Sequence, residues 1–141
     1  MNEPDPRSIA AWFDAMQEFV VNQDYAAARN MFDPNVIGFG SRTAVEGIDL
    51  LERDQWRLVW PKLKSFTFDV AQGRIVFSDD GSMAMAAVPW SSVGESETGG
   101  AFDRPGRATV VFRQDADAGD WRALHIHFSL ATEPPARPSA D

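Results

Sequence analysis

The residues best suited to chemistry lie near the carboxyl end of the chain. His125 and His127 are its two histidines, and a single isoleucine separates them. On a β-strand this spacing places both imidazoles on one face. His127 can act as a general acid or base because an imidazole titrates near neutral pH, and Arg107 can hold a carboxylate or an enolate with its two-pronged guanidinium. The same residues fit a purely structural interpretation, in which the histidines support a hairpin or a dimer interface and Arg107 forms an ion pair.

Composition argues against several other kinds of site. The chain contains no cysteine, which excludes disulfides, thiolate metal sites and cysteine nucleophiles. Metal sites can use the His-x-His spacing, but a third ligand would have to be a distant carboxylate, so we predict no metal site. The aspartates of residues 115–120 lack the length and the closing glutamate of an EF-hand. No glycine-rich nucleotide motif or nucleophile elbow occurs, and we expect no cofactor.

Charge and hydrophobic content restrict the partners and the location. The formal net charge of −8 argues against nucleic acid or an anionic membrane surface as partner, because both bind basic patches. No stretch approaches the roughly 18 apolar residues of a membrane span, and the first residues lack a leader pattern, so we predict a cytoplasmic protein. A hydrophobic content of 44% indicates a folded core. We expect one domain over residues 1–131 and a flexible, proline-rich tail over residues 132–141.

The two histidines belong to a predicted antiparallel hairpin. The β-branched and aromatic runs 108–112 and 124–128 flank the turn-forming residues 115–120. Alternation along the second run puts Leu124, with the next isoleucine and phenylalanine, on one face and the histidines on the other. Because the apolar face should cover helices, the histidines and Arg107 would lie on the outer face, where a partner subunit would sit, unless a bulge reverses the faces locally.

The remaining pattern predicts helices first and strands afterwards. Asp5 and Pro6 are suited to begin a helix, and Thr43 with Glu46 has the spacing of a capping box before another. The expected order is a helix from residue 6, a short helix over 25–32, a strand over 36–39, a helix over 47–60, and antiparallel strands over 66–77, 83–93 and the hairpin. This order predicts an α+β domain with helices packed on one face of a curved antiparallel sheet.

Several aromatic side chains are candidates for lining a ligand cavity. Ligand pockets are mostly apolar with a few polar groups, and aromatic residues at helical spacing also serve as core. We expect about two of the aromatic candidates to contact a ligand. The predicted ligand-binding residues are Trp12, Phe39, Trp56, Trp60, Trp90 and His125.

Three stretches carry a resemblance to a known family. Residues 24–36 are similar to a "D-x-x-x-x-x-x-x-F, acidic turn, strand" passage, and Glu46 with Gly47 is similar to an "E/R-G" helix entry. Residues 106–109 and 121–129 match the terminal pattern "G-R-x-T … W-x-x-x-H-x-H-x-S". These matches resemble the nuclear transport factor 2-like superfamily, also called ketosteroid isomerase-like, and within it the SnoaL-like domains. The terminal hairpin is also similar to the association domain of calcium/calmodulin-dependent kinase II.

The resemblance extends over residues 8–131 and implies a cone-shaped α+β fold. In that fold three N-terminal helices pack on the concave face of the sheet, the wide end holds a ligand cavity, and the outer face commonly forms a homodimer. The steroid isomerases of this superfamily use a carboxylate base on the first short strand and its following loop. Gly38 or its neighbours stand there in this chain, and no acid occurs between Val36 and Ala44, which argues against the same enolisation chemistry.

Three functions remain as hypotheses, because one fold supports many activities. The first is a small-molecule-binding SnoaL-like domain of unassigned specificity, acting as a homodimer. The second is an isomerase, dehydratase or hydrolase without organic cofactor, in which His127 is the acid or base and Arg107 stabilises an anion. The third is a homo-oligomeric association module whose outer face matters more than its cavity.

Overall fold

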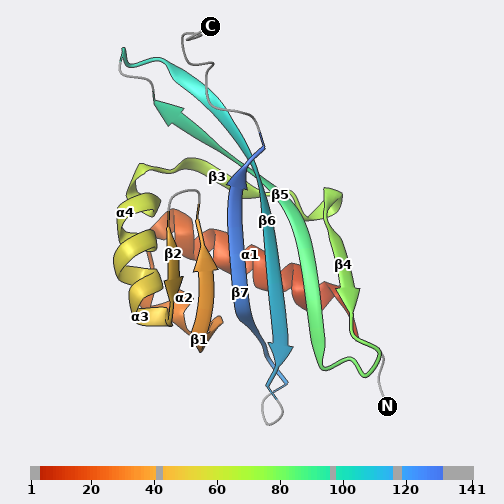
Figure 1. Ribbon diagram of the computed structural model, residues 1–141. Coiled ribbons are helices and arrows are strands. Elements are labelled where there is room, and N and C mark those ends of the chain that lie inside the picture. Colours follow the sequence, from red (N-terminus) through yellow and green to blue (C-terminus); the bar gives the residue numbers. More distant parts are fainter. Residues whose placement is uncertain (1–3, 41–42, 96–97, 116–118, 132–141) are drawn as a thin grey trace, which may run out of the picture.

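The chain folds into helices that cover one face of a curved sheet (Figure 1). A computed structural model describes residues 4–40, 43–95, 98–115 and 119–131, so the predicted tail 132–141 lies outside the described residues. The elements are α1 (Pro6–Asn22), α2 (Tyr25–Arg29), β1 (Phe32–Phe39), β2 (Ala44–Glu46), α3 (Ile48–Leu51), a π-helix (Glu52–Trp56), α4 (Arg57–Val59), a 3-10 turn (Trp60–Lys62), β3 (Lys64–Phe68), a 3-10 turn (Val70–Gln72), β4 (Arg74–Phe77), β5 (Met83–Glu95), β6 (Ala101–Gln114) and β7 (Trp121–Leu130).

The sheet has seven strands and is mixed rather than purely antiparallel. Its order is β2-β1-β7-β6-β5-β3, and β4 pairs with β5 beside β3. The predicted α+β class is confirmed, but the prediction of an antiparallel sheet is wrong for one pair, because β1 and β7 run parallel. Parallel neighbouring strands need a long connection. Here the chain forms all the other strands of the sheet between β1 and β7 before it returns to β1. The first strand therefore lies beside the last.

The first helix begins where the sequence predicts. The side chain of Asp5 accepts a hydrogen bond from the backbone N–H of Arg7 at 2.9 Å, Pro6 occupies the first turn, and Gln23 ends the helix with φ 53°. Its apolar stripe lies against the face of the sheet that we call the inner face, and the opposite side is the outer face (Figure 1). The buried residues of this stripe are Ile9, Trp12, Phe13, Met16 and Val20.

The predicted second and third helices need correction. The second ends at Arg29, and Phe32 begins strand β1. The predicted capping box is wrong, because residues 44–46 form β2 by pairing with β1. Gly47, with φ 95°, turns the chain from strand into helix, a backbone conformation that glycine adopts without penalty. The helix that follows is interrupted by a π-helical turn, which buries Gln55 and Trp56 together.

The terminal hairpin forms as predicted, with one shift in its faces. Val111 pairs with His125 and Phe112 pairs with Ala123, so β7 carries an extra residue, Leu124, at a bulge. As a result Ala123 is buried in the core and Leu124 is half-buried, which corrects the prediction that Leu124 shares the fully buried face.

Aromatic rings from both halves of the chain fill the core between α1 and the sheet. The ring of Trp12 meets the ring of Phe112 edge-on with centroids 4.9 Å apart, and Phe13 meets Phe68 at the same distance. Such contacts add stabilisation beyond the area that the rings bury. The inner face is therefore closely packed with aromatic rings where it faces α1.

Candidate functional site

The predicted catalytic residues all lie on the outer face. Along β6 and β7, Thr109 pairs with His127 and Arg107 pairs with Ser129, while the neighbouring positions of both strands are buried on the inner side. His127 and Arg107 are exposed. The structure thus places them as the apolar pattern of the hairpin suggests, on the side away from α1.

Phe39 lies beside the two histidines on the outer face, whereas the predicted ligand-binding tryptophans lie in the interior. Its ring meets the rings of His125 and His127 edge-on, with centroids 5.1 and 5.5 Å away. Nδ1 of His125 lies 2.7 Å from the backbone oxygen of Ile37, which fixes the orientation of this ring. Within the described part of the chain neither histidine has a carboxylate partner at ion-pair distance. The acid–base role of His127 therefore stays a prediction, without an orienting group in view.

Large apolar side chains are exposed over the same side of the sheet. The set, which we call the outer patch, consists of residues between 37% and 56% exposed. A shallow groove of about 250 Å³ runs through part of it, lined among others by Val76, Met83, Met85 and Val111. Exposed apolar side chains that gather into a large patch are typical of protein contact sites. The outer patch comprises Ile37, Phe39, Val76, Met83 and Met85.

Three of the predicted ligand-binding tryptophans are packed into the interior. Trp12 donates its indole N–H to the backbone oxygen of Met31 at 3.0 Å. Trp56 stacks on Trp60 with ring centroids 4.7 Å apart, and Trp60 stacks in turn on Tyr25 at 5.2 Å. Their role in ligand binding stays a prediction. In this structure their rings contact one another and the core.

Trp90 differs from the other tryptophans because its polar atom is unused. It lies on the inner face of β5, with its ring centroid 5.8 Å from that of Phe66 and 5.9 Å from that of Phe128. The residue is 7% exposed, and Nε1 is buried without a hydrogen-bond partner among the described residues. An indole N–H is a donor only, and buried donors are nearly always paired in native proteins. Trp90 therefore presents an unsatisfied donor inside an aromatic cluster.

A second unsatisfied group lies on the same strand and the same face. Ser92 is 2% exposed, and its Oγ also lacks a partner in the part of the chain that the structure describes. Ser92 pairs directly across to Arg104 on β6, in the stretch where β5 and β6 continue past the end of β7 (Figure 1). We call Trp90, Ser92 and Arg104 the hairpin site. Sequence reasoning missed Ser92 and Arg104, although alternation from Trp90 along the predicted strand 83–93 would have placed Ser92 on the same face.

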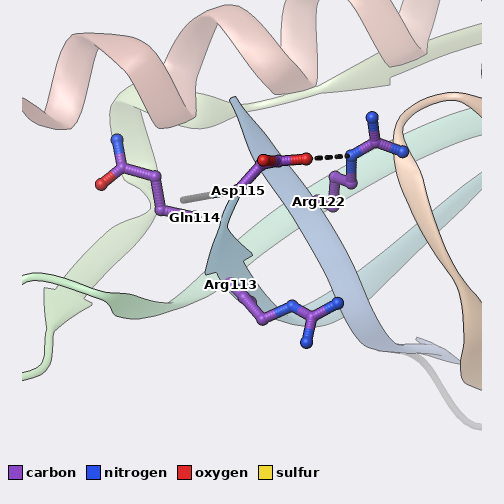
Figure 2. A pocket seen from close by; sticks show the side chains of 4 residues that line it. All are labelled: Arg113, Gln114, Asp115 and Arg122. Atoms are coloured by element: carbon purple, nitrogen blue, oxygen red, sulfur yellow. Dashed lines mark ion pairs between the residues drawn. The ribbon is translucent and has the colours of Figure 1, made fainter. Parts of the chain in front are cut away.

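In a second pocket, shown in Figure 2, the charged side chains are already paired. It has a volume of about 280 Å³ and is lined by Arg113, Gln114, Asp115 and Arg122 at the β6–β7 turn. Nε of Arg122 lies 3.6 Å from the carboxylate of Asp115, an ion pair just beyond hydrogen-bond length, and Arg113 pairs with the buried Asp33. Because both cations already face carboxylates, this pocket offers no free charge to a ligand.

A second charged cluster, centred on Glu52, stabilises the fold. Arg29 pairs with Asp49 and with Glu52, whose second oxygen accepts a hydrogen bond from Arg57 at 2.8 Å. Burial tends to raise the pKa of Glu52, but the hydrogen bonds from Arg57 and Arg29 outweigh it and hold that pKa below its usual value. This network fastens α2 to the π-helix, so both arginines are paired with carboxylates that belong to the fold.

Two further findings bear on the expected partners. Across residues 4–40, 43–95, 98–115 and 119–131, no group of three or more histidine, aspartate or glutamate side chains is arranged to hold a metal ion. None of the helices in those segments combines the length and the apolar character needed to cross a membrane. The cytoplasmic location stays a prediction.

Comparison with solved structures agrees with the fold. A nuclear transport factor 2-like superfamily protein from Salmonella enterica superposes with a TM-score of 0.74 at 19% identity, covering 95% of this chain and 93% of that one. A ketosteroid isomerase-like protein from Erwinia carotovora gives a TM-score of 0.74 at 16% identity, with coverages of 90% and 96%. The CaMKII hub of S. rosetta gives 0.73 at 20% identity, with coverages of 89% and 95%.

Sequence comparison identifies the family. No curated protein matches this chain. A family model described as a SnoaL-like domain matches residues 9–133, which include most of α1, the whole sheet and the terminal hairpin with its two histidines. The chain therefore belongs to the SnoaL-like domain family.

Proposed function

We propose that this SnoaL-like domain binds a small apolar molecule at the hairpin site, on the inner face of β5 and β6. The observation that carries the proposal is the buried, unpartnered N–H of Trp90 within a cluster of aromatic rings. Leaving such a donor unsatisfied costs about 1–3 kcal/mol, and an acceptor atom on a bound ligand would recover that free energy. The rings of Phe66 and Phe128 supply the apolar surroundings typical of ligand sites.

The enzymatic alternative has less support from the geometry. His127 and Arg107 project from the outer face, whereas Trp90 faces inward on the other side of the same sheet. A ligand at the hairpin site would be separated from them by the sheet itself. Binding without chemistry by these two residues is therefore the function that we favour.

The proposal can be tested with neutral aromatic carbonyl compounds such as 3-phenylpropionamide. The five tryptophans give five indole N–H signals in a nitrogen-15 spectrum, and Trp90→Phe identifies the signal of Trp90. We expect the probe to shift that signal and to raise the melting temperature in proportion to its occupancy. Trp56→Phe, which alters an equally buried ring away from the hairpin site, should keep binding, while Trp90→Phe should lose most of it. An unmoved Trp90 signal at saturating probe would refute the proposal.

We also propose that the domain forms a homodimer through the outer patch. The patch is supported by its exposed apolar side chains and by the groove beside Met85, a surface that a second copy related by a two-fold axis can cover. Light scattering should give twice the monomer mass of 15.6 kDa, and Met85→Glu should reduce it to the monomer mass. Leu58→Glu is the matched control, because Leu58 is 60% exposed but lies on α4. A monomeric wild type, or equal effects of both variants, would exclude this interface.

A further inference from the structure

We propose that the hairpin site is built for a carboxylate, so that its ligand is an aromatic or similarly apolar carboxylic acid whose carboxylate is held by Arg104, Ser92 and Trp90. This inference rests on the proposed function, because it names the chemical class of the molecule bound there. It goes further by adding a cation and a hydroxyl to the indole donor.

The pairing of β5 with β6 brings the three side chains to one face. Trp90 pairs with Gly106, and Ser92 pairs with Arg104 one step nearer the hairpin tip. Directly opposed residues of an antiparallel pair have Cβ atoms about 4.5–5.5 Å apart. The alternating burial along β5 puts Trp90 and Ser92 on the inner side, so Arg104, opposite Ser92, shares that side with both.

Two glycines make room for this arrangement. A Cβ at Gly106 would lie 2.6 Å from Nε1 of Trp90, so the polar edge of the indole rests over β6. A Cβ at Gly94 would lie 2.7 Å from Cδ of Arg104, so the arginine stem crosses from β6 over β5, just beyond Ser92. The ring of Phe102 approaches the same point equally closely. The bare backbone at Gly94 therefore lets the stem of Arg104 cross β5 beside Ser92.

The donors at this site all require an acceptor. An indole N–H and a guanidinium only donate hydrogen bonds, and a serine hydroxyl can donate as well. Within the described residues the side chain of Arg104 has neither an ion pair nor a hydrogen bond, in contrast to Arg29, Arg57 and Arg113. A carboxylate supplies two acceptor oxygens and a charge, and its planar geometry matches the guanidinium.

The described acidic side chains of β5 and β6 beyond the end of β7 lie on the outer face. Asp103 pairs with Val93 at an outer-face position, and the carboxylate of Glu95 faces Nζ of Lys64 at 3.4 Å. Among the residues that the structure describes, no carboxylate lies within ion-pair distance of Arg104. The aromatic cluster beside Trp90 would then receive the apolar body of the acid, while its carboxylate points along β5 toward Ser92.

The experiment compares an acid with its neutral counterpart of the same shape. The probes are 3-phenylpropionate and 3-phenylpropionamide, titrated at neutral pH while the indole signal of Trp90 is observed. We expect wild-type protein to bind the acid at least tenfold more tightly than the amide. Arg104→Gln and Arg104→Met should abolish that preference and keep the amide affinity, and Ser92→Ala should weaken binding of the acid by at least threefold. Arg107→Gln, an exposed arginine on the outer face of the same strand, should leave the preference unchanged.

The outcomes separate this inference from the proposed function. If acid and amide bind equally to the wild type, or if both Arg104 variants keep the preference, the carboxylate site is refuted while ligand binding at Trp90 stands. If the preference disappears in Arg107→Gln instead, the charge lies on the outer face and the inference is again refuted. If neither probe moves the Trp90 signal, both the inference and the proposed function fail. Melting temperatures of the free variants confirm that each compared protein is folded.

Discussion

Replacing Gly106 by alanine should destabilise the fold through a single contact. A Cβ at this position would lie 2.1 Å from Cε2 and 2.2 Å from Cζ2 of Trp90, whereas carbon atoms pack best about 3.5–4.0 Å apart. The indole would have to move by about 1.5 Å, although the rings of Phe66 and Phe128 pack against it. Overpacking of this kind costs about 1–3 kcal/mol, so we expect a fall in melting temperature of about 3–10 °C.

Gly94→Ala is the matched control, because it changes the same residue type on the same face of the same pair of strands. Its Cβ would meet Cδ of Arg104 and the ring edge of Phe102, which is 48% exposed and can move aside. Alanine is favoured over glycine in a strand by about 0.5–1 kcal/mol, so this variant should be at least as stable as the wild type. Urea unfolding at one fixed protein concentration measures both.

A double mutant isolates the contact. In a Trp90→Leu background, Gly106→Ala should cost less than about 0.5 kcal/mol, because the ring that it displaces is gone. The reasoning is refuted if Gly106→Ala is as stable as the wild type, or if it costs the same free energy with and without the indole of Trp90.

Two further predictions concern charges. Hydrogen bonds from the backbone and hydroxyl of Ser82, and from the hydroxyl of Ser78, lower the pKa of Asp80 to about 2. Because this folded-state pKa is below the usual 3.8, the stabilisation by the Asp80 carboxylate is complete above pH 3.8 and is lost as the pH falls toward 2. Urea unfolding should therefore show a smaller loss of stability between these pH values for Asp80→Asn than for the wild type. Asp33→Ala removes a carboxylate 8% exposed and paired with Arg113, and should lower the unfolding free energy by about 1.5–3 kcal/mol.

Each of these has a clear contrary result. Equal acid sensitivity of the wild type and Asp80→Asn between pH 4 and 2 would mean that the turn hydrogen bonds add nothing to stability. For Asp33→Ala, a change in unfolding free energy below about 0.5 kcal/mol would mean that the ion pair with Arg113 contributes no more than an ordinary exposed ion pair.

Local signals in the sequence predict the elements whose ends they mark. The cap at Asp5 and the apolar stripe define α1, and two β-rich runs define the terminal hairpin. Strand β2 escaped prediction because a three-residue strand has no periodicity, and its Glu46 suggested a capping box. The parallel pairing of β1 with β7 also has no local signal, since it depends on where the chain returns. Likewise the bulge at Leu124 follows from the register with β6.

The site was only partly predictable for a related reason. Aromatic content drew attention to Trp90, but residue type alone cannot separate it from Trp12 or Trp56, whose environments differ only through tertiary packing. Phe39 seemed suited to a cavity, and the pairing of β1 with β7 carries it to the histidines outside. What distinguishes the hairpin site is an unmet hydrogen bond, which becomes visible only when the neighbours of Trp90 and Ser92 are known.

The parallel pair also sets the order in which the protein can be completed during synthesis. Strand β1 leaves the ribosome early, yet one of its two neighbours, β7, is among the last segments made, and the indole of Trp121 must still reach the hydroxyl of Ser8 at 3.0 Å. Contacts so distant in sequence form slowly because a long loop has to close first. A pause in translation before residue 121 leaves β1 with an uncovered edge, the kind of surface to which other nascent chains and chaperones bind.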